Sequence, residues 1–278
     1  FNKKIDAEVD RFNSLQSKFS ELVAQIPNLP DDDVPRGDSE DHNIVLDEVI
    51  YRKEEGLDHV EIGNKLGLLD FDLANKISGS RYVVLKGKLA QLQRALIQFM
   101  LDHAEANGYS EYYVPLIVNS ESLFGTGQLP KFEEDQFSVG QDKYLIPTAE
   151  VPLTNFIRDK VLDGDELPLK LCAHTPCFRS EAGSYGKDTK GMIRQHQFEK
   201  VEIVQIVHPE NSEKVLDELV TNAKSLLDHL ELSYRTVNLC TGDLGFSAAK
   251  TIDIEVWLPS QNQSLIHISE PTRRILIS

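Results

Sequence analysis

The stretch that decides the fold is CAHTPCFRSEAGSYGKDTKGMIRQHQFEKVE, residues 172–202. An apolar lead-in is followed by a polar, glycine-bearing segment and then by a second apolar run. The alternation of apolar residues at Val201 and Ile203 is typical of a strand. The whole pattern therefore predicts a strand, a long loop and a second strand. A loop of about 15 residues inside a compact domain is uncommon and is usually functional.

This loop region carries four cationic side chains in a chain that is otherwise acidic. They are Arg179, Lys187, Lys190 and Arg194. The formal net charge of the 278-residue chain is −16. Because phosphate binding needs clustered cations, the bulk surface is a poor non-specific partner for nucleic acid. The loop is thus the predicted contact for an anion.

The composition favours a globular protein of a reducing compartment. Apolar residues make up 40% of the chain, which is enough for a sizeable core. The three cysteines, an odd number, give no disulfide framework. No apolar run approaches the ~18 residues that a membrane span needs, and no signal peptide is present. We therefore expect a cytoplasmic protein without a membrane partner.

Residues 1–26 have a heptad pattern that predicts an amphipathic helix with a coiled-coil tendency. One seam of this helix is formed by Ile5, Phe12, Phe19 and Ile26. A helix packed on its own domain is one explanation. The narrow seam suits a partner helix better, which leads us to expect that half of a two-helix arm is missing. Pro27 and Pro30 end the helix, and the acidic residues that follow predict a linker.

The remaining chain predicts strands with interspersed helices. Helices are expected over 89–106 and 211–230, and strands over 112–118, 144–146, 233–239 and 252–256. Pro115 lies within the first of these strands and marks it as an edge, which is a common dimer surface. The order of elements favours an α+β fold with a mixed, mainly antiparallel sheet flanked by helices. A doubly wound nucleotide fold is disfavoured because no glycine fingerprint follows the first strand.

Several residues are candidates for a binding site on their chemistry alone. Thr148 and Glu150, two apart on a segment expected to be extended, point to the same side and suit an ammonium group and a hydroxyl. Arg179 and Glu181 also fit an ordinary surface ion pair, and Phe198 also fits a core position. The trio Cys172, His174 and Cys177 invites a zinc interpretation, but its spacing is imperfect and a fourth ligand is not evident. No metal site is therefore predicted in the chain as given.

Five segments resemble segments of one protein family, and they occur in the same order as in that family. They read GSRYVVLKG at 79–87, FGTGQLPKFEED at 124–135, IPTAEVPLTN at 146–155, FRSEAGSYGKDTKGMIRQHQFEKVE at 178–202 and TGDLGFSAAKTIDIEVWLPSQ at 241–261. The fourth is similar to the second signature motif of class II aminoacyl-tRNA synthetases, in the form found in seryl-tRNA synthetase. The resemblance implies the class II antiparallel catalytic sheet, a homodimer and an N-terminal helical arm that grips tRNA. Pro115 would be the proline of the dimer motif.

The resemblance also implies a reaction. In the family, the carboxylate of L-serine attacks the α-phosphate of ATP, and the acyl group of the resulting seryl-adenylate passes to tRNA(Ser), or to tRNA(Sec) where that tRNA exists. The implied catalytic residue is Arg179, which would bridge the serine carboxylate and the α-phosphate. The implied ATP-binding residues are Arg179, Ser180, Glu181, which would accept from the adenine amino group, and Phe198, which would stack on the adenine. The implied serine-binding residues are Thr148, Ala149, Glu150 and Glu202.

The end of the chain departs from the family pattern. After Gln263 the sequence reads SLIHISEPTRRILIS, where the family continues with Mg²⁺ ligands and a third motif. This string resembles a translated sequencing adapter. We therefore expect residues 1–30 to be the second helix of a coiled-coil arm, residues 31–56 an acidic linker, residues 57–263 a catalytic domain without its third motif, and residues 264–278 a non-native tail.

Two functions follow from these expectations. The first is a serine--tRNA ligase, a homodimeric ATP-binding enzyme of protein biosynthesis, of which the fragment as given is expected to be inactive. The alternative is a truncated synthetase-like paralogue that binds adenylate or a protein partner without charging tRNA. Serine-dependent exchange of pyrophosphate into ATP distinguishes the two.

Overall fold

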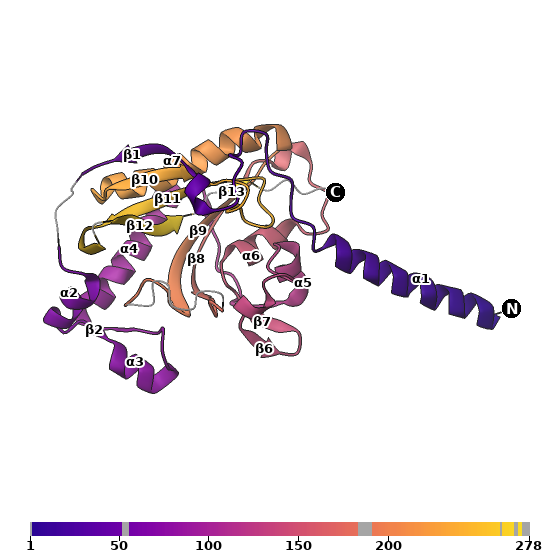
Figure 1. The fold of residues 1–278 in the computed structure, drawn as a ribbon, viewed down its shortest axis with the longest axis horizontal. Coiled ribbons are helices and arrows are strands. Elements are labelled where there is room, and N and C mark those ends of the chain that lie inside the picture. The colour runs from indigo at the N-terminus through magenta and orange to yellow at the C-terminus, as the bar shows by residue number, and fades with distance from the viewer. Residues whose placement is uncertain (1, 52–55, 183–190, 262, 270–271, 274–278) are drawn as a thin grey trace.

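The computed structural model describes residues 2–51, 56–182, 191–261, 263–269 and 272–273. One helix, α1 (Asn2–Val23), projects away from a body of helices and sheets (Figure 1). Its apolar side chains remain exposed, with Phe12 and Phe19 at 64% and 68%. The predicted amphipathic helix is confirmed, and packing on its own domain does not explain its apolar seam.

The long hairpin predicted from residues 172–202 is present. Strands β8 (Leu169–Phe178) and β9 (Gln197–Ile206) pair antiparallel along their whole length, from Leu169 opposite Ile206 to Phe178 opposite Gln197. The short β4 (Ser110–Glu111) adds to β8 in parallel. This three-stranded sheet is therefore mixed but mainly antiparallel, as the sequence predicts.

A second sheet has the order β1–β10–β11–β12, and β13 also pairs with β11. All of its pairs are antiparallel. Its strands are β1 (Ile44–Val49), β10 (Tyr234–Asn238), β11 (Lys250–Leu258), β12 (Gln263–Ser269) and β13 (Thr272–Arg273). The pairing of β12 does not test whether residues 264–278 are native, because strand hydrogen bonds are made by the backbone whatever the side chains are. The non-native tail stays a prediction.

The prediction of an acidic linker over residues 31–56 is wrong for residues 44–49, which form β1 and pair with β10. Asp47, one of the acidic residues that suggest a linker, has its negative charge neutralised in the folded structure. Asp47 forms an ion pair with Lys224 and accepts a hydrogen bond from Thr236. Burial opposes ionisation of this carboxyl, but the two bonds outweigh it and lower the pKa of Asp47.

The prediction of a single strand over residues 112–118 is also wrong. Strand β4 ends at Glu111 and β5 (Ile117–Asn119) begins six residues later, in a different sheet of order β5–β7–β6. Pro115 lies between them and is exposed. Since proline has no N–H to donate to a ladder, it suits the point where the chain changes sheets. Strand β5 pairs with β7 (Lys143–Leu145), which pairs on its other side with β6 (Ser138–Gly140). A separate small pair joins β2 (Leu69–Asp70) to β3 (Val84–Leu85).

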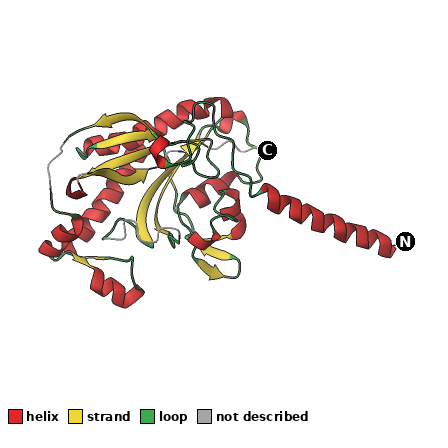
Figure 2. Cartoon of the chain, in the orientation of Figure 1, coloured by secondary structure: helices red, strands yellow, loops and turns green. Residues whose placement is uncertain are grey.

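Helices flank the strands, as Figure 2 shows. They are α2 (His59–Leu66), α3 (Phe71–Ser78), α4 (Gly87–Ala106), α5 (Ser120–Gly125), α6 (Glu150–Thr154) and α7 (Ser212–His229). On one face of the hairpin, Ala104 of α4 and Leu219 of α7 pack with Cys172. On the other face, Leu153 of α6 packs with Leu171 and Ala173 near the open end of the hairpin. No helix in the described part of the chain combines the length and apolar composition needed to cross a membrane.

Candidate functional site

One face of the β8–β9 hairpin carries a row of candidate functional side chains. Phe198, Lys200 and Glu202 alternate along β9 and therefore point to the same side. The residues opposite them on β8 share that side, because directly opposed residues of an antiparallel pair do so. These are Cys177, Thr175 and Ala173, which are small and at most 2% exposed. The large side chains of β9 therefore lie beside small, buried side chains of β8 on this face.

Thr148 joins this row from a distant part of the sequence. Its hydroxyl donates a 2.6 Å hydrogen bond to Oε2 of Glu202. The same carboxylate oxygen lies 2.6 Å from Nζ of Lys200. Thr148 is 4% exposed. A hydrogen bond to a carboxylate is stronger than one between neutral groups, so the orientation of Glu202 is well defined.

The segment that contains Thr148 and Glu150 is not extended, contrary to the sequence prediction. Helix α6 begins at Glu150, and the Glu150 backbone N–H donates to the Thr148 hydroxyl over 3.1 Å. Threonine hydroxyls commonly turn the backbone in this way. Ala149 between them is fully buried and packs with Val114 and Leu153. Because Ala149 has no exposed surface, its contact with serine stays a prediction.

Arg179 follows β8 directly and lies over the same face. Its guanidinium carbon is 5.3 Å from the centre of the Phe198 ring, and its Nε donates to the Pro147 carbonyl over 3.4 Å. The backbone of Arg179 is fixed by His196, whose carbonyl accepts from Arg179 N over 3.1 Å and whose Nδ1 lies 3.0 Å from the Arg179 carbonyl. Arg179 and Phe198, predicted as separate contacts for one nucleotide, are therefore neighbours.

Glu181 has a left-handed backbone with φ of 53°. Such a conformation is uncommon for a residue with a side chain and often marks a functional position. It is stabilised from several sides. Arg194 Nη1 donates to Glu181 Oε2 over 3.0 Å, and Arg81 Nη1 donates to the Glu181 carbonyl over 3.2 Å. The carboxylate thus pairs with Arg194, and the surface ion pair with Arg179 considered from the sequence is not what forms here.

The residues beside Glu181 are anchored to the segment at 134–135. Ser180 N donates to the Asp135 carbonyl over 3.0 Å, and the Ser180 hydroxyl donates to the Glu134 carbonyl. Ala182 N donates to Asp135 Oδ1 over 2.9 Å. Sequence reasoning did not single out Asp135, and its place in FGTGQLPKFEED, residues 124–135, is the only signal that pointed to it. Lys187 and Lys190, the other predicted loop cations, lie outside the described residues.

The two cysteines of β8, Cys172 and Cys177, are buried free thiols. Burial raises the pKa of Cys172 to about 11. Burial also raises the pKa of Cys177, a shift that the charges of Lys200 and Arg179 partly oppose. Cys172 and Cys177 point to opposite faces of β8, so they do not converge on one ion. No group of three or more potential ligands is present among the described residues.

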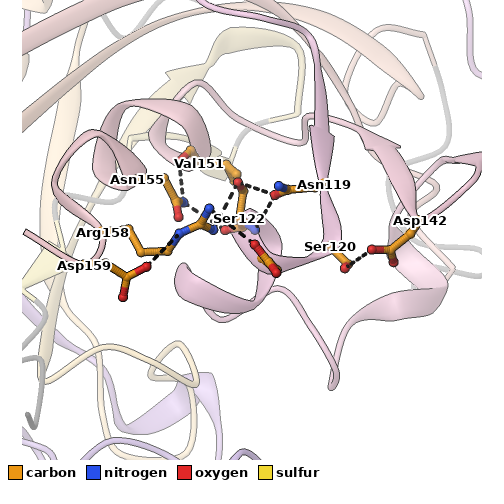
Figure 3. Close-up of polar contacts among 9 residues, drawn as sticks. Asn119, Ser120, Ser122, Asp142, Val151, Asn155, Arg158 and Asp159 are labelled. Atoms are coloured by element: carbon orange, nitrogen blue, oxygen red, sulfur yellow. Dashed lines mark hydrogen bonds and ion pairs between the residues drawn. The ribbon is translucent and has the colours of Figure 1, made fainter.

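A polar cluster ties α5 to α6 and to the residues that follow α6 (Figure 3). Asn155 Nδ2 donates to the Ser122 carbonyl over 2.9 Å and to the Val151 carbonyl over 2.8 Å. Arg158 Nη1 donates to the Ser122 hydroxyl over 3.4 Å. Because α6 starts two residues after Thr148, this cluster helps to fix the position of Thr148.

Comparison with known proteins gives the family. The tRNA synthetase class II core domain family (G, H, P, S and T) matches residues 131–273, just over half of the chain. The chain therefore belongs to the class II tRNA synthetases. It is 57% identical over 265 residues to a serine--tRNA ligase of Cellvibrio japonicus, an alignment that covers 93% of this chain and 62% of that protein. The chain thus spans less than two thirds of the length of this relative.

Solved structures share the fold. The crystal structure of seryl-tRNA synthetase from Pyrococcus horikoshii complexed with ATP has a TM-score of 0.88 and 35% identity, over 95% of this chain and 64% of that one. The SerRS of M. kandleri, solved with A. aeolicus tRNASec, has a TM-score of 0.66 and 20% identity, over 94% of this chain and 56% of that one. At that identity it shows the fold alone. The predicted α+β class II fold with a mainly antiparallel sheet is confirmed.

Proposed function

We propose that the protein to which this chain belongs attaches L-serine to tRNA(Ser) in two steps that depend on ATP. Serine's carboxylate attacks the α-phosphate, and the bond from that phosphorus to the β-phosphate oxygen breaks to release pyrophosphate. A terminal ribose hydroxyl of the tRNA then attacks the carbonyl carbon of seryl-adenylate and releases AMP. The observation that carries the proposal is the bond between Thr148 and Glu202, which joins two predicted serine-binding residues 54 positions apart.

The charges on the hairpin face suit the zwitterion of serine. Glu202 and Glu150 supply carboxylates for the ammonium group, and the Thr148 hydroxyl retains a lone pair that can accept from it. Arg179 supplies a planar fork for the serine carboxylate and the α-phosphate, which a lysine would match less well. Such fixed charges lower the barrier to adenylate formation because the protein need not reorganise during the step.

The nucleotide would lie at the closed end of the hairpin. We assign Phe198 to stacking with adenine and Glu181 to the adenine amino group. Ser180 is assigned to ATP through its backbone carbonyl, since its hydroxyl and its N–H already donate to the carbonyls of Glu134 and Asp135. The solved structure that supports this assignment carries ATP and is 35% identical to this chain in an alignment that covers 64% of that structure's chain. The Mg²⁺ ligands are expected beyond residue 263, where no side chain is described, and no step is assigned here to the ion.

The remaining proposals concern assembly and partners. We assign α1 to a tRNA-binding coiled-coil arm, because its apolar seam is exposed along the helix. Pro115 is assigned to a homodimer surface, because it is exposed beside Tyr113, which is fully exposed as well. We place the catalytic domain at residues 57–263, extended by β1. tRNA(Sec) is a further proposed substrate, and the cytoplasm is the proposed location. Inactivity of the 278-residue chain on its own also stays a prediction.

Serine-dependent exchange of pyrophosphate into ATP tests this proposal. A suitable protein joins residues 1–263 of this chain to the flanking segments of the Cellvibrio japonicus relative, so that the hairpin face is supplied by this chain alone. Exchange that requires serine supports the ligase. Binding of ATP without any exchange is the behaviour expected of a paralogue that does not charge tRNA.

A further inference from the structure

Lys200 is not among the residues that the family resemblance assigns, yet it lies in the middle of the functional row. Its neighbours on the same face of β9 are Phe198 and Glu202, and its cross-strand partner is Thr175. Thr175 is 2% exposed and small, so the long Lys200 side chain extends above it. Lysine heads normally reach for water, whereas the Lys200 ammonium turns along the strand to Glu202.

The ammonium of Lys200 and the hydroxyl of Thr148 meet the same oxygen of Glu202. Both lie 2.6 Å from Oε2. Within the described part of the chain, no hydrogen bond to the other oxygen, Oε1, is present. Two donors on one oxygen fix the rotation of a carboxylate more firmly than one donor does. Among the described residues, Oε1 is therefore the oxygen of Glu202 that is left to accept from a ligand.

The ion pair between Lys200 and Glu202 is partly exposed to solvent. The side chain of Lys200 is 30% exposed and that of Glu202 is 20% exposed. A pair so placed is weaker than a fully buried one, so its value lies in geometry more than in stability. The Lys200 ammonium offsets the Glu202 carboxylate beside it, so this pair adds no net charge where a zwitterionic amino acid would bind.

We propose that Lys200 is a positioning residue for amino-acid selection, which holds Glu202 so that Oε1 points at the amino group and hydroxyl of the substrate. This inference rests on the proposed function and names a residue beyond it. Lys200 acts through Glu202 and Thr148, and it takes no part in the transfer of the phosphorus or of the acyl group. It should therefore affect binding of the amino acid and leave binding of ATP unaffected.

The test is steady-state pyrophosphate exchange in the chimaeric protein, with serine and ATP varied separately. Lys200→Met keeps the length of the side chain and removes its donors. We expect the KM for serine to rise roughly 10-fold or more, as for loss of a hydrogen bond to a charged group, and the KM for ATP to change less than about 2-fold. Lys200→Arg keeps a cation and should recover most of the serine KM.

Lys170→Met is the matched control, because Lys170 lies on β8 at 28% exposure and pairs with Glu218 outside the functional row. It should leave both KM values unchanged. An unchanged or lower serine KM in Lys200→Met, with a normal unfolding curve, would overturn the inference, because Glu202 would then be held without Lys200. Equal rises in both KM values would also overturn it. If the parent protein shows no serine-dependent exchange, the proposed function itself fails.

Discussion

The Thr148 hydroxyl and the Glu202 carboxylate form a 2.6 Å hydrogen bond that connects the start of α6 to the middle of β9. Thr148→Val removes the donor while keeping the shape of the side chain. It leaves the Glu150 N–H without its acceptor and Glu202 with Lys200 alone. We expect the KM for serine to rise roughly 10-fold and the free energy of unfolding to fall by about 1–2 kcal/mol. Pyrophosphate exchange and urea denaturation measure the two effects.

Thr221→Val is the control for this substitution. Thr221 is exposed on α7, and within the described residues its hydroxyl donates to the Asp217 carbonyl of its own helix and to no other group. Both the KM for serine and the stability should stay at the parent values. An unchanged serine KM in Thr148→Val would show that Thr148 does not take part in binding the amino acid.

Arg179 is the residue on which adenylate formation is expected to depend most. Arg179→Ala should lower the kcat of exchange by about 100-fold or more, the usual effect of losing one group that stabilises charge in a transition state. Arg179→Lys should recover little of it, since an ammonium lacks the planar fork. Arg36→Ala, at an exposed position among residues 31–43, is the control. A parental rate in Arg179→Ala would remove Arg179 from the mechanism.

Asp135 is expected to affect ATP rather than serine. Its carboxylate accepts from Ala182 N, and its carbonyl accepts from Ser180 N, so it holds the backbone on both sides of Glu181. Asp135→Ala should raise the KM for ATP by roughly 5- to 10-fold, as for loss of one hydrogen bond to a charged group, with the KM for serine little changed. Asp165→Ala, at an exposed position, is the matched control. A larger change in the serine KM than in the ATP KM would contradict this assignment.

His103 of α4 lies beside His229 of α7, and its environment leads us to expect that stability depends on pH. Burial and the nearby His229 ring lower the pKa of His103 from its ordinary 6.5. As pH falls, His103 is therefore protonated in the unfolded chain before it is protonated in the folded chain. The free energy of unfolding is at its full value above pH 6.5 and decreases as pH falls below 6.5. Urea denaturation between pH 8 and 5 should show a loss that is reduced in His103→Gln. His208→Gln, whose side chain is 56% exposed, should keep the parental slope.

Much of the fold was predictable because local pattern and tertiary structure agree. The period of two around Val201 correctly predicts β9, and the heptads of residues 1–26 correctly predict α1. Both elements have one clearly apolar face, and this face is the signal that the sequence carries. In β9 the apolar face is packed, with Ile203 against the cluster of Ala104, Tyr109 and Cys172, whereas in α1 it stays exposed.

The failures have a different cause. Strand β1 escaped prediction because Asp47 looks like part of an acidic linker, and only its distant partners Lys224 and Thr236 neutralise it. The segment around Pro115 forms two short strands, β4 and β5, which join different sheets. The local sequence pattern does not indicate which sheet a strand joins. Tertiary partners decide both cases.

The candidate site shows the same division. Arg179, Phe198, Glu202 and Thr148 were predictable from motif resemblance, and the structure brings them to one face of the hairpin. Lys200 and Asp135 were not predicted, because the roles proposed for them rest on contacts with Glu202 and with the backbone beside Glu181. Positioning residues are visible only when the distances between side chains are known.

The amino-acid dependence of pyrophosphate exchange tests the central claim most directly. Exchange in the chimaeric protein would be measured with serine, alanine, threonine and glycine at equal concentrations. A site that hydrogen-bonds the hydroxyl of serine should reject alanine strongly, by about 10⁴-fold in kcat/KM. Alanine has no hydroxyl, so its binding would leave the polar groups of the protein that bond to this hydroxyl unpaired. We predict exchange with serine far above the others. Exchange that is absent, or that is equal or higher with another amino acid, would contradict the account.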